Sequence, residues 1–151
     1  MRVSTDDGRF GFILNSVTGS MFRFQLIVDS RSIGDDEPCI LGSAMHQLGN
    51  LKTLNDERLA RLPEDPIAVS SALRSDEELH DAATLSLAES FDRWLIHGYA
   101  YNGTVVILAQ EYEGGELAGD ILVSVLDESE YDAIFGVLRD FWTKARDHQP
   151  A

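Results

Sequence analysis

The residues best able to do chemistry are spread along this chain without the spacing that catalysis or metal binding requires. No two of the four histidines stand at metal-ligand spacing, and a single cysteine cannot complete a zinc cluster. His97 falls inside a predicted strand, where an isolated histidine is more often a packing or surface residue than a catalyst. Cys39 has no base close to it in the sequence, so we interpret it as a small buried hydrophobe. The histidines are His46, His80, His97 and His148.

The short motifs of nucleophilic and nucleotide chemistry are also missing from the sequence. It has no nucleophile elbow of the form G-x-S-x-G, no serine three residues before a lysine, no phosphate-binding P-loop and no dinucleotide-binding glycine pattern. Asp35, Asp36 and Glu37 lack the alternating ligands of an EF-hand. Nothing singles out two of the 26 acidic residues as a glycosidase pair. We therefore expect no catalytic residue, no cofactor and no metal, although a hydrolase or isomerase with dispersed carboxylates stays open as an alternative.

Net charge is the most unusual property of the sequence. Twelve basic and 26 acidic residues give a net charge of −14 and an isoelectric point near 4.4. Nucleic acid and anionic membranes repel such a surface, whereas a basic protein would be attracted to it. The alternative is that the acidity only keeps the protein soluble.

Candidate partner-binding residues are therefore sought on the surface. Tyrosine and arginine are typical interface anchors because they combine apolar area with a polar tip, and one predicted strand carries Arg93, Tyr99 and Tyr101 on a single face. If both faces of the sheet are covered, the two tyrosines belong to the core instead. Separately, the acidic segments have an alternative interpretation as solvated loops. The acidic candidates are Asp35, Asp36 and Glu37 in one loop, and Glu111, Glu113, Glu116 and Asp120 in another segment.

Hydrophobic periodicity predicts the elements that would position these residues. Alternation or β-rich composition predicts five strands, and Asn102-Gly103 predicts a two-residue type I′ turn. Helices are expected after an N-cap at Ser43, at the capping-box-like Ser75, and from Asp127 or Ser129 onward. A short helix is predicted over Asp56–Leu62, while Ile67–Leu73 is compatible with helix or strand. The predicted strands are Phe10–Leu14, Met21–Val28, Phe91–Tyr101, Thr104–Tyr112 and Ile121–Leu126.

These elements predict one α+β domain over residues 1–151, with fraying expected at 1–8 and 147–151. Their order, ββ-α(α)-βββ-α, predicts a mainly antiparallel sheet of about five strands with helices packed mostly on one face. We also expect Trp142 to fill the space left by Gly98 and Ala100. No apolar run approaches the roughly 20 residues of a membrane helix. The lone cysteine and a polar N-terminus without a signal-peptide pattern predict a cytoplasmic location.

Three segments resemble immunity proteins of bacterial polymorphic-toxin systems, in particular the group numbered forty-two. They are LGSAMHQLGNLKTL (Leu41–Leu54), the hairpin ESFDRWLIHGYAYNGTVVILAQ (Glu89–Gln110) and ILVSVLDESEYDAIFGVLRDFW (Ile121–Trp142). The likeness covers about two thirds of the chain and lies in layout and texture, because these families have no short invariant motif.

The resemblance implies a non-enzymatic, cytoplasmic protein that binds a cognate bacterial toxin domain, as in contact-dependent inhibition, and blocks it by covering the active site or an adjacent exosite. A basic nuclease or deaminase is the expected toxin, with no nucleic acid and no membrane as direct partners. The oligomeric state stays open. A non-catalytic adaptor or chaperone of a secretion system is the alternative that fits the acidic composition equally well.

Overall fold

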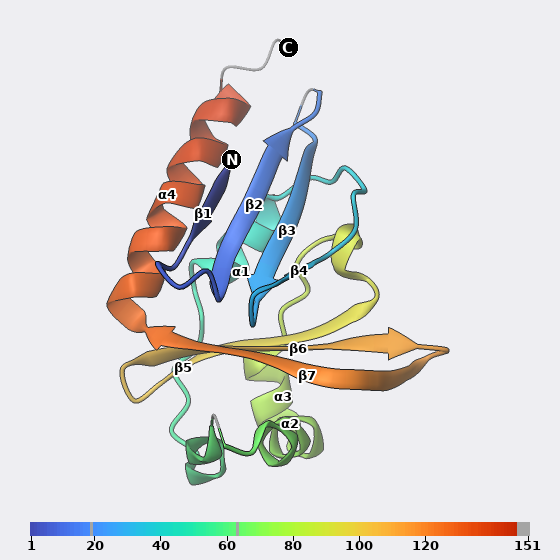
Figure 1. Ribbon diagram of the computed structural model, residues 1–151, viewed down its shortest axis with the longest axis vertical. Coiled ribbons are helices and arrows are strands. Elements are labelled where there is room, and N and C mark those ends of the chain that lie inside the picture. Colours follow the sequence, from blue (N-terminus) through green and yellow to red (C-terminus); the bar gives the residue numbers. More distant parts are fainter. Residues whose placement is uncertain (19, 63, 148–151) are drawn as a thin grey trace.

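The described residues form seven strands in two antiparallel sheets, as the computed structural model shows (Figure 1). The structure describes residues 1–18, 20–62 and 64–147. The first sheet has the order β1-β2-β3-β4, and the second has the order β5-β6-β7. The strands are β1 (Arg2–Ser4), β2 (Phe10–Ser16), β3 (Phe22–Val28), β4 (Arg31–Ile33), β5 (Trp94–Tyr101), β6 (Thr104–Glu113) and β7 (Glu116–Asp127).

Helical segments separate and follow the two sheets. Each of the helices α1, α2 and α3 is ten residues or shorter, and α4 is 20 residues long. No helix in this described part of the chain is long and apolar enough to cross a membrane. The segments are α1 (Gly42–Leu48), η1 (Glu57–Arg61), α2 (Pro66–Ser75), α3 (Glu77–Ala83), η2 (Glu89–Phe91) and α4 (Glu128–Asp147).

The α+β class is confirmed, but the prediction of one sheet of about five strands is wrong. The predicted pair and the predicted triplet of strands belong to different sheets, and β1 and β4 were not predicted. These two edge strands have three residues each, too few to produce a recognisable alternation. β1 also lies in the stretch 1–8 for which we expected fraying, and the Met1 ammonium group donates a hydrogen bond to the Leu14 carbonyl at 2.8 Å. Residues 148–151, including His148, lie outside the described residues.

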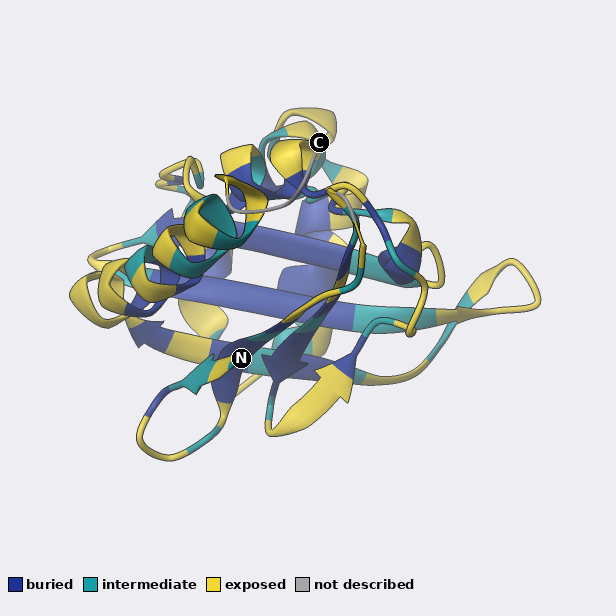
Figure 2. Ribbon diagram, turned by 90° about the horizontal axis from the view of Figure 1, so that it is seen from above, coloured by how far each residue is buried: buried dark blue, intermediate teal, exposed yellow. Residues whose placement is uncertain are grey.

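The second sheet lies between two layers, which explains its long apolar runs. Figure 1 shows β1–β4, α1 and α4 above it and η1, α2 and α3 below it. Seen from above, the middle parts of its strands are buried (Figure 2). The prediction of helices mostly on one face is therefore wrong. A strand covered on both faces has no polar side, so β6 reads Val105-Val106-Ile107-Leu108-Ala109 without alternation.

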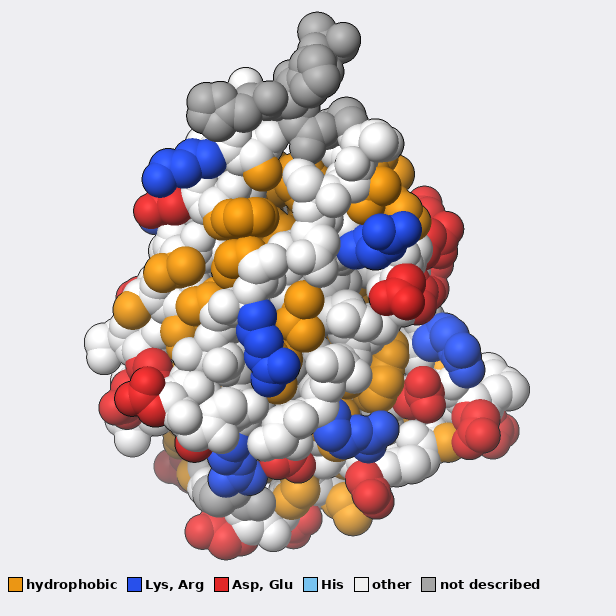
Figure 3. All heavy atoms as spheres, turned by 45° about the horizontal axis from the view of Figure 1, so that its top comes forward, with side chains coloured by type: hydrophobic (Ala, Val, Ile, Leu, Met, Phe, Trp, Pro, Cys, Tyr) orange, Lys and Arg blue, Asp and Glu red, His pale blue; other side chains and the backbone are white. Residues whose placement is uncertain are grey.

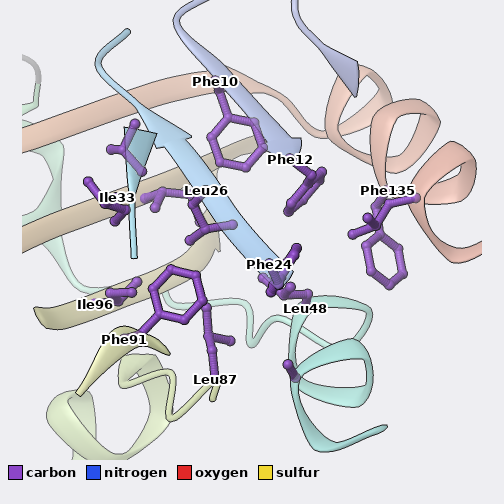
Figure 4. Close-up of a cluster of buried hydrophobic side chains, with 14 of the residues drawn as sticks. Phe10, Phe12, Phe24, Leu26, Ile33, Leu48, Leu87, Phe91, Ile96 and Phe135 are labelled. Carbon is purple, nitrogen blue, oxygen red and sulfur yellow. The ribbon is translucent and has the colours of Figure 1, made fainter. Parts of the chain in front are cut away.

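The layer above the second sheet encloses the larger cluster, called here the upper core (Figure 4). The Phe10 and Phe12 rings meet edge to face with centroids 5.2 Å apart, and Phe24 meets Phe91 in the same way at 5.8 Å. The Tyr131 hydroxyl donates a 2.6 Å hydrogen bond to the Leu48 carbonyl, which ties α4 to the end of α1. The upper core includes Phe10, Phe12, Leu14, Phe24, Leu26, Leu48, Phe91, Ile96, Ile107, Leu126, Tyr131, Phe135 and Leu138.

The layer below the second sheet encloses a smaller cluster, the lower core. Its helical segments begin with aspartate caps: the side chains of Asp56, Asp65 and Asp76 accept hydrogen bonds from the Arg58, Ala68 and Leu79 amides. The ambiguous stretch 67–73 is helical because Asp65 caps the helix and Pro66 occupies its first turn. The lower core consists of Leu54, Leu59, Val69, Leu73, Ala83, Tyr99, Val106 and Leu108.

The remaining local predictions are partly correct. Asn102 and Gly103 have φ angles of 50° and 80°, as a type I′ turn requires. The apolar stripe of α4 faces the upper core. The space beside Gly98 is filled by Leu85 and Leu51 instead of the predicted Trp142, whose half-buried ring lies 4.4 Å from the Arg146 guanidinium carbon. α1 begins one residue before the predicted cap at Ser43 and has no side-chain cap.

Candidate functional site: an acidic surface around η2

Two of the predicted acidic segments lie next to each other in the fold, on either side of η2. The Asp35 amide donates a 2.8 Å hydrogen bond to the Ser90 carbonyl in η2. Two residues after η2, the Arg93 carbonyl accepts a 2.7 Å hydrogen bond from the Tyr112 amide in β6. The loop after β4 and the β6–β7 hairpin are therefore both anchored to the segment 90–93, although about 75 residues separate them in sequence.

The acidic loop is held by backbone contacts that leave its carboxylates at the surface. Cys39 and Phe22 exchange two backbone hydrogen bonds of 2.8 and 2.9 Å, so the end of the loop lies beside β3. The Arg23 guanidinium donates to the Asp36 carbonyl at 3.1 Å, and Asp35 accepts a bond from the Glu37 amide at 2.9 Å. All three acidic side chains of the loop are exposed.

Acidic residues dominate the surface around this anchor point. Figure 3 shows acidic side chains on the side of the molecule where the loop after β4 and the β6–β7 hairpin lie, with basic side chains between them. Glu89, the first residue of η2, and Asp92, which follows η2, add two exposed carboxylates that we did not predict from the sequence. We define the η2 surface as Asp35, Asp36, Glu37, Glu89, Asp92, Arg93, Glu111, Tyr112, Glu113 and Glu116.

A mostly apolar hollow of about 350 Å³ opens within the η2 surface. It exists because the segment 84–88 runs along the outer edge of β5, where the Leu85 amide donates to the Ile96 carbonyl at 2.9 Å. Tyr112, which is 36% exposed, borders it opposite this segment. An apolar hollow with Asp92 in its lining, beside the other carboxylates of the η2 surface, offers both buried contact area and charge attraction to a basic protein. Its lining includes Leu85, Leu87, Ala88, Phe91, Asp92, Trp94, Leu95 and Tyr112.

The structure separates the predicted set of Arg93, Tyr99 and Tyr101. Arg93 is exposed at one end of β5, whereas Tyr101 is half-buried at the other end, beside the Asn102-Gly103 turn. Tyr99 is completely buried in the lower core. This agrees with the alternative interpretation, in which a sheet covered on both faces makes this tyrosine a core residue. Asp120 is exposed on β7, four residues beyond Glu116. Only Arg93 of the first set therefore lies on the η2 surface.

The buried cysteine and histidine have the environments of core residues. Cys39 is 5% exposed, and burial, together with the nearby carboxylates of Glu89, Asp35 and Glu37, raises the pKa of its thiol. A raised pKa keeps the sulfur protonated and weakly nucleophilic, which agrees with the structural interpretation of Cys39.

His97 is 1% exposed, and its Nε2 lies 3.4 Å from Nδ1 of His80. Burial, with smaller contributions from the neighbouring His80 and Arg74, lowers the pKa of His97 to about 4. His97 is therefore neutral at pH 7. In the part of the chain that the structure describes, no three histidine, cysteine or acidic side chains are grouped so that they could hold a metal ion.

The sequence matches no protein-family model, and it matches no curated protein. Among solved structures, the chain is similar to the crystal structure of CdiI from Burkholderia dolosa AUO158, with a TM-score of 0.61 and 16% sequence identity. The similarity covers 93% of this chain and 99% of the CdiI chain. The two chains thus share a fold over nearly their whole lengths.

Proposed function

We propose that this protein is an immunity protein that binds and neutralises the toxin of a contact-dependent inhibition system. The observation that carries the proposal is the fold shared with CdiI, a contact-dependent inhibition immunity protein, over almost the full length of both chains. The resemblance of three sequence segments to toxin-immunity proteins supports the same role independently. The group numbered forty-two is the particular family that those segments resemble.

The proposed action is stoichiometric binding in the bacterial cytoplasm, without catalysis or a cofactor. The protein covers the toxin's active site or an adjacent exosite, and the net charge of −14 favours a basic toxin such as a nuclease or a deaminase. The η2 surface is our proposed contact region, because its carboxylates would speed association and its apolar hollow would slow dissociation.

Co-expression with the toxin domain encoded next to this protein's gene tests the role directly. We expect the protein to restore growth to cells that produce the toxin domain, and to co-purify with it at a one-to-one ratio. Toxicity that persists although both chains are soluble would contradict the proposal. Co-purification with secretion machinery instead would favour the adaptor or chaperone alternative.

Charge reversal tests the contribution of the acidic loop. We expect the triple change Asp35→Lys, Asp36→Lys and Glu37→Lys to slow association with the toxin on the order of ten-fold at low salt, with less effect at high salt. The matched control reverses three exposed acidic residues of α4, Asp132, Asp140 and Asp147, and so changes the net charge equally. Equal slowing by both triple variants would show that total charge acts, and not the η2 surface.

A further inference from the structure

The outer edge of β7 is a sheet edge that no other strand of the described residues covers. β7 pairs with β6 on one side only. The opposite edge of the same sheet is different, because Thr53 and Thr84 form bridges to Ala100 and His97 of β5. Backbone hydrogen bonds of 2.8 and 2.9 Å between Ala100 and the segment 52–54 complete that cover. An uncovered edge presents unpaired N–H and C=O groups to which another chain can add a strand.

A groove of about 560 Å³ runs along this edge. Its floor is the last part of β7, residue 121 and residues 123–127. One wall consists of the β1–β2 turn and Asp29, and the other contains Pro66 at the start of α2. The Ser124 hydroxyl accepts a 2.9 Å bond from the Asp29 amide and donates a 3.0 Å bond to the Arg9 carbonyl. The upper wall is thereby fixed to the strand, so the groove is a preformed feature of the fold.

The floor of the groove lacks the features that usually protect a sheet edge. Proteins prevent strand addition with edge lysines, prolines, inward charges or bulges. Residues 121–126 read Ile-Leu-Val-Ser-Val-Leu, without charge or proline, and residues 122–126 keep a regular register with β6. The irregularity in that pairing lies between Leu122 and Ala118, the partners of Ala109 and Glu111, so it ends where the regular stretch begins. Val125 is 43% exposed on this stretch, and Ile67 is 72% exposed directly after the groove residue Pro66.

The ends and upper wall of the groove are acidic. Asp7, Asp29, Asp127 and Glu130 border it, and Arg9, the one cation among the described residues that line it, is paired with Asp29 at 3.0 Å. These charges favour an occupant with basic side chains. β7 also connects this groove to the η2 surface, because its first residue, Glu116, belongs to that surface. One bound protein could therefore contact both regions along a single strand of roughly 40 Å.

We propose that an extended, basic segment of the partner toxin pairs with the outer edge of β7 at residues 121–126 and adds a strand to the β5–β6–β7 sheet. The inference rests on the proposed immunity function. Main-chain hydrogen bonds supply affinity in this mode, and alternate side chains of the added strand supply specificity. Apolar side chains of the segment contact Val123 and Val125, and basic side chains contact the acidic border.

Hydrogen exchange of the wild-type complex is the first test, with the toxin domain of the neighbouring gene as the probe. We expect the outward-pointing backbone amides of residues 121–126 to exchange at least ten-fold more slowly in the complex than in the free protein. A stable complex in which those amides exchange at the free rate would overturn strand addition and leave the immunity function intact. If the wild-type protein forms no complex with the toxin domain, the proposed function fails and this inference fails with it.

A matched pair of valine substitutions is the second test. Val125→Lys places an edge lysine in the groove, whereas Val137→Lys makes the same change at a 50% exposed position on α4. We expect Val125→Lys to weaken toxin binding at least ten-fold and Val137→Lys to weaken it less than two-fold. Equal affinities for the two variants would overturn the inference. Self-association of the free protein that Val125→Lys abolishes would identify a second copy of this chain as the occupant, and would also overturn it.

Discussion

The two faces of the β5–β6–β7 sheet are built by different means. The upper core joins two sheets and α4 through phenylalanine rings, and its buried tyrosine hydroxyl, on Tyr131, is hydrogen-bonded. The lower core is smaller and contains a completely buried tyrosine, Tyr99, whose hydroxyl has no partner among the described residues. The buried His97 lies on the same side of the sheet and contacts His80 of α3. Polar groups in the lower core thus reduce the stability that its apolar contacts provide.

Surface ion pairs hold part of the lower layer in place. The Arg58 guanidinium bridges Asp56 at 2.7 Å and Asp76 at 2.8 Å, and so links η1 to the N-cap of α3. These hydrogen bonds lower the pKa of both carboxyl groups, that of Asp56 to about 2. Arg58 is exposed and the two aspartates are partly exposed, so solvent screens these pairs. From this difference between the faces we predict that the upper core provides most of the global stability and that η1, α2 and α3 open on their own.

Two leucine truncations give the largest expected effects. Leu48 in the upper core and Leu73 in the lower core are both completely buried helix residues. Each change to alanine should cost roughly 3 kcal/mol, because it removes buried methyl groups and leaves a cavity. We expect Leu48→Ala to speed hydrogen exchange throughout the chain, and Leu73→Ala to speed it mainly in α2 and α3. The same global pattern for both variants would show that the two cores unfold as one unit.

Acidification should destabilise the lower core through His97. Below pH 6.5 the unfolded chain binds a proton on His97 that the folded chain does not bind until about pH 4. The contribution of neutral His97 to the free energy of unfolding is therefore fully present above pH 6.5. It is lost as the pH drops to 4, by about 3 kcal/mol in total. Denaturant melts across this range measure the loss. The lowered carboxyl pKa values of Asp56 and Asp76 make stability depend on pH only below pH 3.8, outside this window.

Replacing histidines one at a time assigns the acid effect. His97→Gln should remove most of the loss between pH 6.5 and 4, whereas His46→Gln, at an exposed position on α1, should leave it unchanged. A pH dependence that survives His97→Gln would mean that another group, and not the buried histidine, limits stability in acid.

Local signals in the sequence were enough to predict much of the fold but not its layering. The type I′ turn, the stripe of α4 and the grouping of strands into a pair and a triplet all follow from residues close together in the chain. The second sheet's cover on both faces depends on contacts between distant segments. The continuous apolar residues of β6 were the one local sign of this cover. Because both faces of the sheet are covered, Tyr99 is a core residue.

The candidate surface was predicted in its charges but not in its shape. The acidic loop 35–37 and the hairpin acids Glu111, Glu113 and Glu116 stand out as charge clusters in the sequence. Their common anchor at η2 rests on backbone bonds of Ser90 and Arg93, which no side-chain pattern encodes. The hollow beside them likewise requires the bridge between Thr84 and His97, so sequence alone could not place it.

Removing the hydrogen-bonded hydroxyl of Tyr131 should lower the free energy of unfolding less than acidification does. Tyr131→Phe deletes the donor to the Leu48 carbonyl and keeps the ring stacked against Phe135. We expect a loss of about 1–2 kcal/mol in the free energy of unfolding, because the buried carbonyl at the end of α1 then lacks this donor. Denaturant unfolding at pH 7 measures it. An unchanged stability would indicate that water replaces the hydroxyl at the carbonyl.

The smallest effect is expected from the same substitution on the opposite face of the sheet. Tyr99→Phe removes a hydroxyl that burial keeps from water and that has no partner in the described part of the chain, so no bond is lost. Because the desolvation cost of that oxygen disappears with it, we expect stability to stay unchanged or to rise by up to about 1 kcal/mol. Measuring Tyr99→Phe and Tyr131→Phe under identical conditions separates the contribution of the hydrogen bond to stability from that of the ring. A loss equal to that of Tyr131→Phe would mean that the Tyr99 hydroxyl binds a water molecule in the lower core, and that this core is as well satisfied as the upper one.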